Sequence, residues 1–203
     1  QLATFSPDGN KIAFIRENNI FLTDLILNKE VQITFDGKIN EIINGIPDWV
    51  YEEEFGFSKA FEWSPDSKYL AWIRFDERKV PEFSMTMFQG QAPSLDKNKL
   101  YPGIETFKYP KAGEANSIVT VHSYNLADSV THDINIGTDT DIYIPRIRFT
   151  PDSSKLAIFK LNRLQNSLDI LLASVQTGES RLLMTETNKY YIDDNYYDDI
   201  RFL

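Results

Sequence analysis

The sequence predicts an all-β protein that forms about three four-stranded antiparallel blades of a larger β-propeller. One turn-and-strand motif occurs three times, as FSPDGNKIAFI from Phe5, WSPDSKYLAWI from Trp63 and FTPDSSKLAIF from Phe149. Short apolar strands separated by turn residues follow the first and third copies, and repeats of several short strands are typical of propeller blades. An unrelated β-sandwich with similar turns is the alternative, and three copies of one motif favour the propeller.

The repeated motif predicts a tight turn that leads into a buried strand. Proline presets the backbone angle φ of the turn, and the aspartate after it bonds to nearby backbone amides. The aliphatic-Ala-apolar residues that come next indicate the strand. After the first turn we expect strands KIAFIR, IFLTDL and VQITF, and after the third turn KLAIFKL, LDILLASV and RLLMTE.

The positions of the motifs divide the chain into segments of one partial propeller domain, residues 1–203. A full propeller needs at least four blades, and the final DDIRFL looks like the approach to a fourth copy, so we expect a fragment of a longer protein. The expected segments are a blade at about 1–45, a segment with an acidic run at 46–60, a blade with an arm at 61–148, and a blade with the start of the next at 149–203.

The arm is expected at residues 84–117, where the sequence departs from the blade rhythm. This stretch, SMTMFQGQAPSLDKNKLYPGIETFKYPKAGEANS, mixes apolar residues with Pro, Gly and Lys. A single blade does not need it, and insertions of this kind usually carry function. A projecting ribbon cannot bury its apolar side chains against its own blade, which indicates a partner surface. A flexible loop without a partner is the alternative.

The composition excludes several classes of function. The net charge is −9, with 30 acidic and 21 basic residues, which argues against nucleic acid as a partner. There is no cysteine, so disulfides and thiolate chemistry are excluded. The two histidines, His122 and His132, lack a metal-ligand spacing and are expected at ordinary strand or turn positions. No Gly-x-Ser-x-Gly elbow or phosphate-binding loop occurs, so we predict no catalytic residue, metal or cofactor in this chain.

The acidic run lies within IPDWVYEEEFGF, residues 46–57, one of the most apolar and aromatic stretches of the chain. Pro47 and Asp48 predict a short helix near 47–56 that Asp48 caps. Helical spacing then predicts that one stripe of residues faces inward: Ile46, Trp49, Val50, Glu53 and Glu54. Tyr51 and Glu52 are expected to point elsewhere. Two adjacent, partly buried carboxylates need a cation between them to stay ionised. A pocket for a positive group and a solvated helix face both remain possible from composition.

The same residues resemble the dipeptidyl peptidase IV family. NGIPDWVYEEEF resembles the segment that carries the family's double-glutamate motif, and the resemblance continues through WSPDSKYLAWIRFDERKVPEF and YPKAGEANS, over most of residues 31–125. The lack of cysteines and of Asn-x-Ser/Thr sites resembles a bacterial member. On this resemblance the chain is part of a homodimeric, exported serine exopeptidase, periplasmic or at the cell surface, whose eight-bladed propeller sits over a separate α/β-hydrolase domain that is absent here.

The resemblance also implies the substrate and the residues that bind it. The family removes Xaa-Pro, and less well Xaa-Ala, dipeptides from peptides with a free N-terminus. Glu53 and Glu54 would hold the substrate's α-ammonium group, and the arm would help to build the homodimer. The tail NKYYIDDNYYDDI falls where the family places a loop at the substrate pocket, and its candidates are Tyr190, Tyr191, Tyr196 and Tyr197. An ordinary surface loop is the alternative for this tail.

Two other functions remain open. A non-catalytic propeller could have kept the turns as a binding scaffold without the enzyme. A related peptidase with tripeptide preference would place its glutamates differently, and the full run of three glutamates, Glu52 to Glu54, argues against it. This chain by itself is expected to be inactive as a peptidase.

Overall fold

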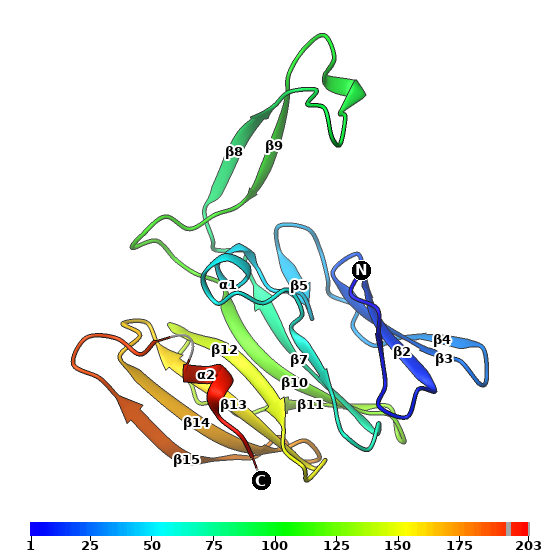
Figure 1. The fold of residues 1–203 in the computed structure, drawn as a ribbon, viewed down its shortest axis with the longest axis vertical. Helices are drawn as coiled ribbons and strands as arrows, with labels where there is room; N and C mark the ends of the chain where they lie inside the picture. Colours follow the sequence, from blue (N-terminus) through cyan, green and yellow to red (C-terminus); the bar gives the residue numbers. More distant parts are fainter. Residues whose placement is uncertain (194–195, 203) are drawn as a thin grey trace.

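The computed structural model describes residues 1–193 and 196–202, which form three antiparallel sheets side by side and an arm that projects from the middle one (Figure 1). The first sheet has the order β1 (Thr4–Phe5), β2 (Lys11–Arg16), β3 (Asn19–Asp24) and β4 (Lys29–Gln32). The second has the order β11 (Val130–Ile134), β10 (Ile118–Asn125), β7 (Tyr69–Asp76) and β5 (Ile42–Asn44), and β6 (Phe61–Trp63) also pairs with β7. The third has the order β12 (Ile142–Phe149), β13 (Lys155–Asn162), β14 (Ser167–Ser174) and β15 (Ser180–Thr187).

This architecture confirms the predicted all-β propeller segment with about three blades. The sheets divide the chain a few residues away from the expected limits at 45 and 148. Strand β5 precedes residue 45 but pairs with β7 of the second sheet, and β12 begins before residue 148 but pairs with β13 of the third. Each of these strands is the first of its blade in sequence, so it comes before the repeated turn rather than after it.

Strand β7 shows why the sheets must stack as blades. Successive side chains of a strand point to opposite faces. Leu70 and Trp72 join a core cluster with the first sheet, whereas Ala71, Ile73 and Phe75 join a cluster with the third. Both faces of the middle sheet are therefore apolar and buried, which accounts for the nearly continuous apolar sequence YLAWIRF.

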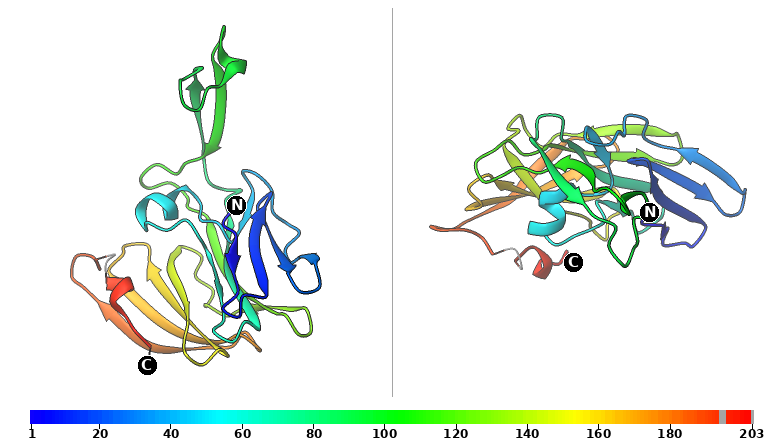
Figure 2. Two further views of the ribbon diagram at one scale, coloured as in Figure 1. Left: turned by 45° about the vertical axis from the view of Figure 1, so that its right-hand side comes forward. Right: turned by 90° about the horizontal axis from the view of Figure 1, so that it is seen from above.

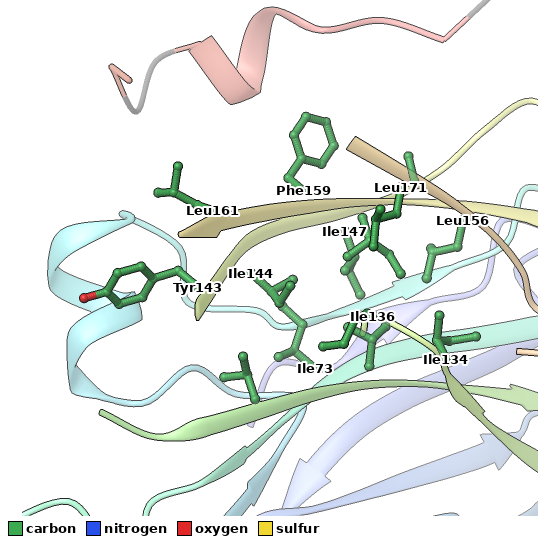
Figure 3. Packing of buried hydrophobic residues seen from close by; sticks show 14 of the residues in the cluster. Ile73, Ile134, Ile136, Tyr143, Ile144, Ile147, Leu156, Phe159, Leu161 and Leu171 are labelled. Carbon is green, nitrogen blue, oxygen red and sulfur yellow. The ribbon is translucent and has the colours of Figure 1, made fainter. Parts of the chain in front are cut away.

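The larger core lies between the second and third sheets (Figure 3). Ile73 of β7 and Ile134 near the outer end of the second sheet meet Ile144, Ile147 and Leu156 of the third sheet there. The same cluster extends to the aromatic residues of helix α1 (Trp49–Glu54), so this short helix is part of the interface between the two blades.

The repeated turns connect neighbouring blades by hydrogen bonds. The backbone amide of Asp8 in the first turn donates to Ser67 Oγ in the second at 3.0 Å. In the same way the amide of Asp66 in the second turn donates to Ser153 Oγ in the third at 3.1 Å. The serine that follows the Pro-Asp pair of the second and third turns thus accepts a bond from the blade before it, which gives the repeat a role beyond the turn itself.

The arm is a two-stranded ribbon, β8 (Glu82–Met87) and β9 (Gly103–Lys108), with a short 3₁₀ helix, η1 (Asp96–Asn98), near its tip. Figures 1 and 2 show it standing away from all three sheets, above α1. At its base Asn40 Nδ2 donates to the carbonyl oxygen of Thr106 at 3.3 Å. The predicted projecting arm is confirmed.

Within the described residues, no helix is long and apolar enough to cross a lipid bilayer.

We predict that Ser67→Ala and Ser153→Ala each weaken the contact between blades. Each variant removes one hydrogen bond and leaves a backbone amide without that acceptor, which costs about 1 kcal/mol. Calorimetry of the complete polypeptide should show the propeller transition lowered by about 2–4 °C. Ser58→Ala, at an exposed loop position, is the control and should leave the transition unchanged. Melting temperatures equal to the control would contradict a role of these hydroxyls between the blades.

Candidate functional site

Helix α1 carries the three glutamates and begins as the sequence predicted. Asp48 is its N-cap, and its Oδ1 atom accepts a hydrogen bond from the amide of Tyr51 at 3.0 Å. The other carboxylate oxygen, Oδ2, accepts from Ser117 Oγ at 2.5 Å. Burial raises the pKa of Asp48, against the lowering effect of the Ser117 hydrogen bond. The start of the helix is thereby tied to the chain that returns from the arm.

Tyr51 anchors the middle of the helix, whereas the helical spacing predicts that it points away from the core. Its side chain is only 1% exposed and packs against the rings of Phe55, Phe75 and Tyr143. Its hydroxyl oxygen accepts a hydrogen bond from the amide of Ile144 in β12 at 3.0 Å. Burial raises the pKa of this phenol well above its ordinary value. The predicted orientation of Tyr51 is therefore wrong, because an amphipathic ring with a buried partner for its hydroxyl fits the blade interface better than a carboxylate.

The three glutamates of α1 stay exposed while Val50 and Tyr51 are buried. Glu52, Glu53 and Glu54 are all exposed in the described structure, so the expected burial of Glu53 and Glu54 is also wrong. Of the predicted stripe, Trp49, Val50 and Glu54 do line one pocket together. Glu53 lies next to it in sequence but does not line this pocket.

The pocket has a volume of about 840 Å³ and lies between α1, the base of the arm and the third sheet. Its walls are mainly aromatic and apolar, with a few polar groups. The lining residues are Trp49, Val50, Glu54, Phe55, Phe83, Met85, Phe107, Tyr109, Pro110, Lys111, Ala112, Asn116, Tyr143, Arg163 and Gln165.

The lining of this pocket combines aromatic rings with polar groups. The ring centroids of Trp49 and Tyr109 are 4.2 Å apart, and Phe83 lies 5.5 Å from Tyr109. Among the polar groups of the lining, Asn116 Nδ2 donates to the hydroxyl oxygen of Tyr143 at 2.8 Å. Glu54 contributes a carboxylate to the lining, and Lys111 and Arg163 contribute two positively charged groups.

Arg163 also lines the pocket, and its guanidinium contacts several groups of the protein. Its Nη2 atom donates to the carbonyl oxygen of Glu114 at 3.0 Å, and Nη1 lies 3.6 Å from Asp141 Oδ1. Its guanidinium lies 5.7 Å from the centroid of the Tyr143 ring. The arginine therefore holds the loop after the arm against the third sheet.

The tyrosine-rich tail reaches the edge of the same region. Tyr190 and Tyr191 are exposed, and the backbone around them runs beside the loop that contains Gln165 of the pocket. There the amide of Ile192 donates to the carbonyl oxygen of Gln165 at 2.7 Å. Neither tyrosine lines the pocket itself. The side chains of Tyr196 and Tyr197 lie outside the described residues.

Metal-ligating residues are not grouped in the described part of the chain, where no cluster of three or more His, Asp or Glu side chains could hold a metal ion. His122 stacks on Trp72 in the second sheet. Its two ring nitrogens lie 2.7 Å from Thr120 Oγ1 and 2.8 Å from Asp133 Oδ1. These contacts hold the His122 ring against its neighbours in the second sheet.

Sequence reasoning missed Tyr51, Ser117 and Arg163. The spacing of Tyr51 and Phe55, four residues apart, was a signal for a second apolar face of the helix. Ser117 and Arg163 gave no local signal, because each is brought to the site by contacts between segments far apart in sequence.

Glu77 is a buried acid beside this site, in the connection from β7 to the arm. Its side chain is 6% exposed. Burial, together with the nearby charges of Asp48 and Asp76 and against that of Lys108, raises the pKa of Glu77 from 4.5 to about 7. Proton release from Glu77 in the folded protein is thus displaced to near-neutral pH.

We predict that Glu77→Gln raises the melting temperature more at pH 8 than at pH 5. A raised pKa in the folded state means that the contribution of Glu77 to stability is present below pH 4.5 and lost as the pH rises to about 7. Glutamine stays neutral throughout and avoids this loss. Thermal unfolding at the two pH values measures the difference, and Glu52→Gln, at an exposed position of α1, is the control. An equal effect of Glu77→Gln at both pH values would refute the raised pKa.

Together the three blades, the capped acidic helix and the insertion that forms the arm define a segment of a β-propeller. The sequence model of a protein family, described as the dipeptidyl peptidase IV (DPP IV) N-terminal region, matches residues 1–203. The chain belongs to this family.

Proteins that are similar to this chain are named as dipeptidyl peptidases or dipeptidyl aminopeptidases. A probable dipeptidyl-aminopeptidase B of Phaeosphaeria nodorum is 36% identical over 208 aligned positions, which cover 98% of this chain and 22% of the relative. The crystal structure of Porphyromonas gingivalis dipeptidyl peptidase 4 superposes with a TM-score of 0.91 and 44% identity, over 100% of this chain and 28% of that one. A putative dipeptidyl aminopeptidase IV from Bacteroides ovatus gives a TM-score of 0.78 at 25% identity, over 96% of this chain and 25% of that one. The chain thus spans about a quarter of the length of these proteins.

Proposed function

We propose that the chain is the substrate-recognition part of a dipeptidyl peptidase IV-like serine exopeptidase that releases Xaa-Pro or Xaa-Ala dipeptides from peptide N-termini. In this proposal Glu53 and Glu54 bind the α-ammonium group of the substrate. The observation that carries it is that the glutamates of α1 are exposed, with Glu54 at an aromatic pocket, on a helix that Tyr51 anchors in the core. The names of the similar proteins support the reaction class.

The proposed contact explains exopeptidase specificity by position. A peptide's terminal amine has a pKa near 8 and is largely protonated at neutral pH. Only a chain end offers this group, and charge-assisted hydrogen bonds to two carboxylates favour it. A fixed distance from the glutamates to the cleaved bond then sets the length of the released fragment. Helix α1 is suited to this role because its cap and Tyr51 hold it in one position.

Catalysis itself is assigned in this proposal to an α/β-hydrolase domain of the same polypeptide. The sequence contains no Gly-x-Ser-x-Gly elbow. The proposal needs no metal or cofactor, and we place the enzyme outside the cytoplasm, in the periplasm or at the cell surface. A non-catalytic binding propeller is the second candidate, and the absence of peptidase activity in the complete polypeptide would favour it.

We predict that Glu53→Gln and Glu54→Gln each lower kcat/KM for a Gly-Pro reporter by about 10- to 100-fold in the complete enzyme. Each variant removes one charge-assisted hydrogen bond to the ammonium group while it keeps the shape of the side chain, and such bonds contribute about 1.5–3 kcal/mol. Steady-state kinetics measures the effect.

Glu52→Gln is the matched control, because Glu52 is an exposed glutamate of the same helix and has no role in substrate binding in this proposal. Its effect should be several-fold smaller. Near-normal cleavage by both the Glu53 and Glu54 variants would contradict the proposed ammonium site.

We also propose that the arm joins two copies of the enzyme into a homodimer. Large apolar side chains on the arm are left uncovered: Phe88, Leu100, Tyr101 and Ile104 are 69%, 84%, 80% and 78% exposed. Such a concentration of exposed apolar surface on a projecting ribbon suits burial against a partner. A second copy is the proposed partner, because most soluble oligomers are homo-oligomers and the commonest are two-fold dimers.

We predict that replacing residues 90–107 by a short Gly-Ser link weakens or abolishes the dimer of the complete enzyme. The replacement removes the exposed residues Leu100, Tyr101 and Ile104 and leaves the three sheets intact. Light scattering over a concentration series measures the change in mass. A variant that keeps the fold but replaces only Asp96 and Lys97 by serine is the control, and a dimer of unchanged affinity after the larger replacement would exclude the arm as the interface.

A further inference from the structure

Arg146 connects the end of α1 with the C-terminal segment of the chain. It lies in β12, the first strand of the third blade. Its Nη1 atom donates to the carbonyl oxygen of Phe55, the C-cap of α1, at 2.9 Å. Its Nε and Nη2 atoms each donate to one carboxylate oxygen of Asp198 at 3.1 Å, in helix α2 (Tyr196–Asp199). One guanidinium thus bridges the end of the acidic helix and the C-terminal segment.

The bond to Phe55 acts on the residue that directly follows Glu54. A helix ends with carbonyl groups that have no partner within the helix, and Arg146 supplies one of them with a charged donor. The guanidinium also lies 5.3 Å from the ring centroid of Phe57, which packs around the same turn. The direction in which Glu53 and Glu54 point therefore depends on where Arg146 holds the end of α1.

Strand β12 fixes the helix at a second place. The amide of Ile144, two residues before Arg146, donates to the hydroxyl of Tyr51. The middle and the end of α1 are thereby attached to the same strand. The attachment through Tyr51 is buried, whereas the one through Arg146 leads on to Asp198, whose side chain is 55% exposed.

The geometry of the Arg146–Asp198 pair suits positioning more than global stability. An ion pair with a largely exposed partner contributes little to the free energy of unfolding. A two-pronged contact between guanidinium and carboxylate, in contrast, defines the relative orientation of the two groups. Arg148 contacts the same carboxylate at 2.6 Å and also the carbonyl oxygen of Ile200, but makes no such bond to α1.

We propose that Arg146 is a positioning residue for substrate binding, which holds the glutamates of α1 in register with the C-terminal segment through Phe55 and Asp198. This inference rests on the proposed function of Glu53 and Glu54 and extends it to a residue that does not touch the substrate. Because Arg146 acts on the orientation of the ammonium site, its loss affects the binding of substrate more than the chemical step.

The test uses the complete enzyme and the chromogenic substrate Gly-Pro-4-nitroanilide. Arg146→Ala should raise KM about 10-fold and leave kcat within about twofold, since small displacements of binding groups are costly. Arg146→Lys keeps one charged donor but loses the fork, so KM should lie between those of Arg146→Ala and the wild type. Arg148→Ala is the matched control: it removes a neighbouring arginine from Asp198 and should change KM by less than about twofold.

Asp198→Asn keeps the bond between Arg146 and Phe55 but weakens the other half of the bridge, and should raise KM less than Arg146→Ala does. This variant and Arg146→Lys keep the test valid if Arg146→Ala does not fold. Equal KM values for the Arg146 and Arg148 variants would overturn the inference, as would a loss of kcat and of melting temperature without a change in KM.

Failure of this inference can be told apart from failure of the proposed function. If Glu53→Gln and Glu54→Gln impair cleavage but the Arg146 variants have normal KM, only the positioning role of Arg146 is refuted. If the glutamate variants cleave normally, the ammonium site itself is refuted, whatever the Arg146 variants do.

Discussion

The middle sheet of this protein has two apolar faces, and both must be covered for the sheet to be stable. Strand β7 meets this constraint by sending alternate side chains into the clusters on either side of it. Because both faces need a partner, the blades stack on one another. This stacking also determines where a segment between two blades lies. The hydrogen bonds from each repeated turn to the serine of the next set the relative position of neighbouring blades at one end.

Helix α1 is such a segment, and its position results from this packing. Tyr51 and Phe55 complete the core between the second and third sheets, and the hydroxyl of Tyr51 finds a partner in β12. The helix has only six residues, and Glu52, Glu53 and Glu54 stay exposed while Tyr51 is buried. The cap and Tyr51 thus hold the acidic residues on a fixed base.

The base of the arm adds the second half of the site. The chain leaves β7 beside the buried Glu77 and returns to β10 at Ser117, whose hydroxyl bonds to the cap of α1. Between these points the arm contributes Phe83, Phe107 and Tyr109 to the pocket. One insertion thus combines a wall of the pocket with a projecting apolar ribbon, and changes at the arm can reach the acidic helix through Asp48.

The sequence by itself determined the blades, the capped helix and the arm, because each depends on local chemistry: Pro-Asp turns, alternating apolar residues, and Asp48 before a helical stretch. The family was also recognisable from it, since DWVYEEE and the flanking segments form a long and unusual pattern. Only the tertiary structure decided which side of α1 is buried. A six-residue helix has apolar residues on more than one side, and the choice fell to Tyr51 because β12 offers its hydroxyl a donor. The structure also brought Arg146, Arg163 and Ser117 to the site from distant segments, since contacts of this kind depend on how blades stack and leave no periodic signal in the chain.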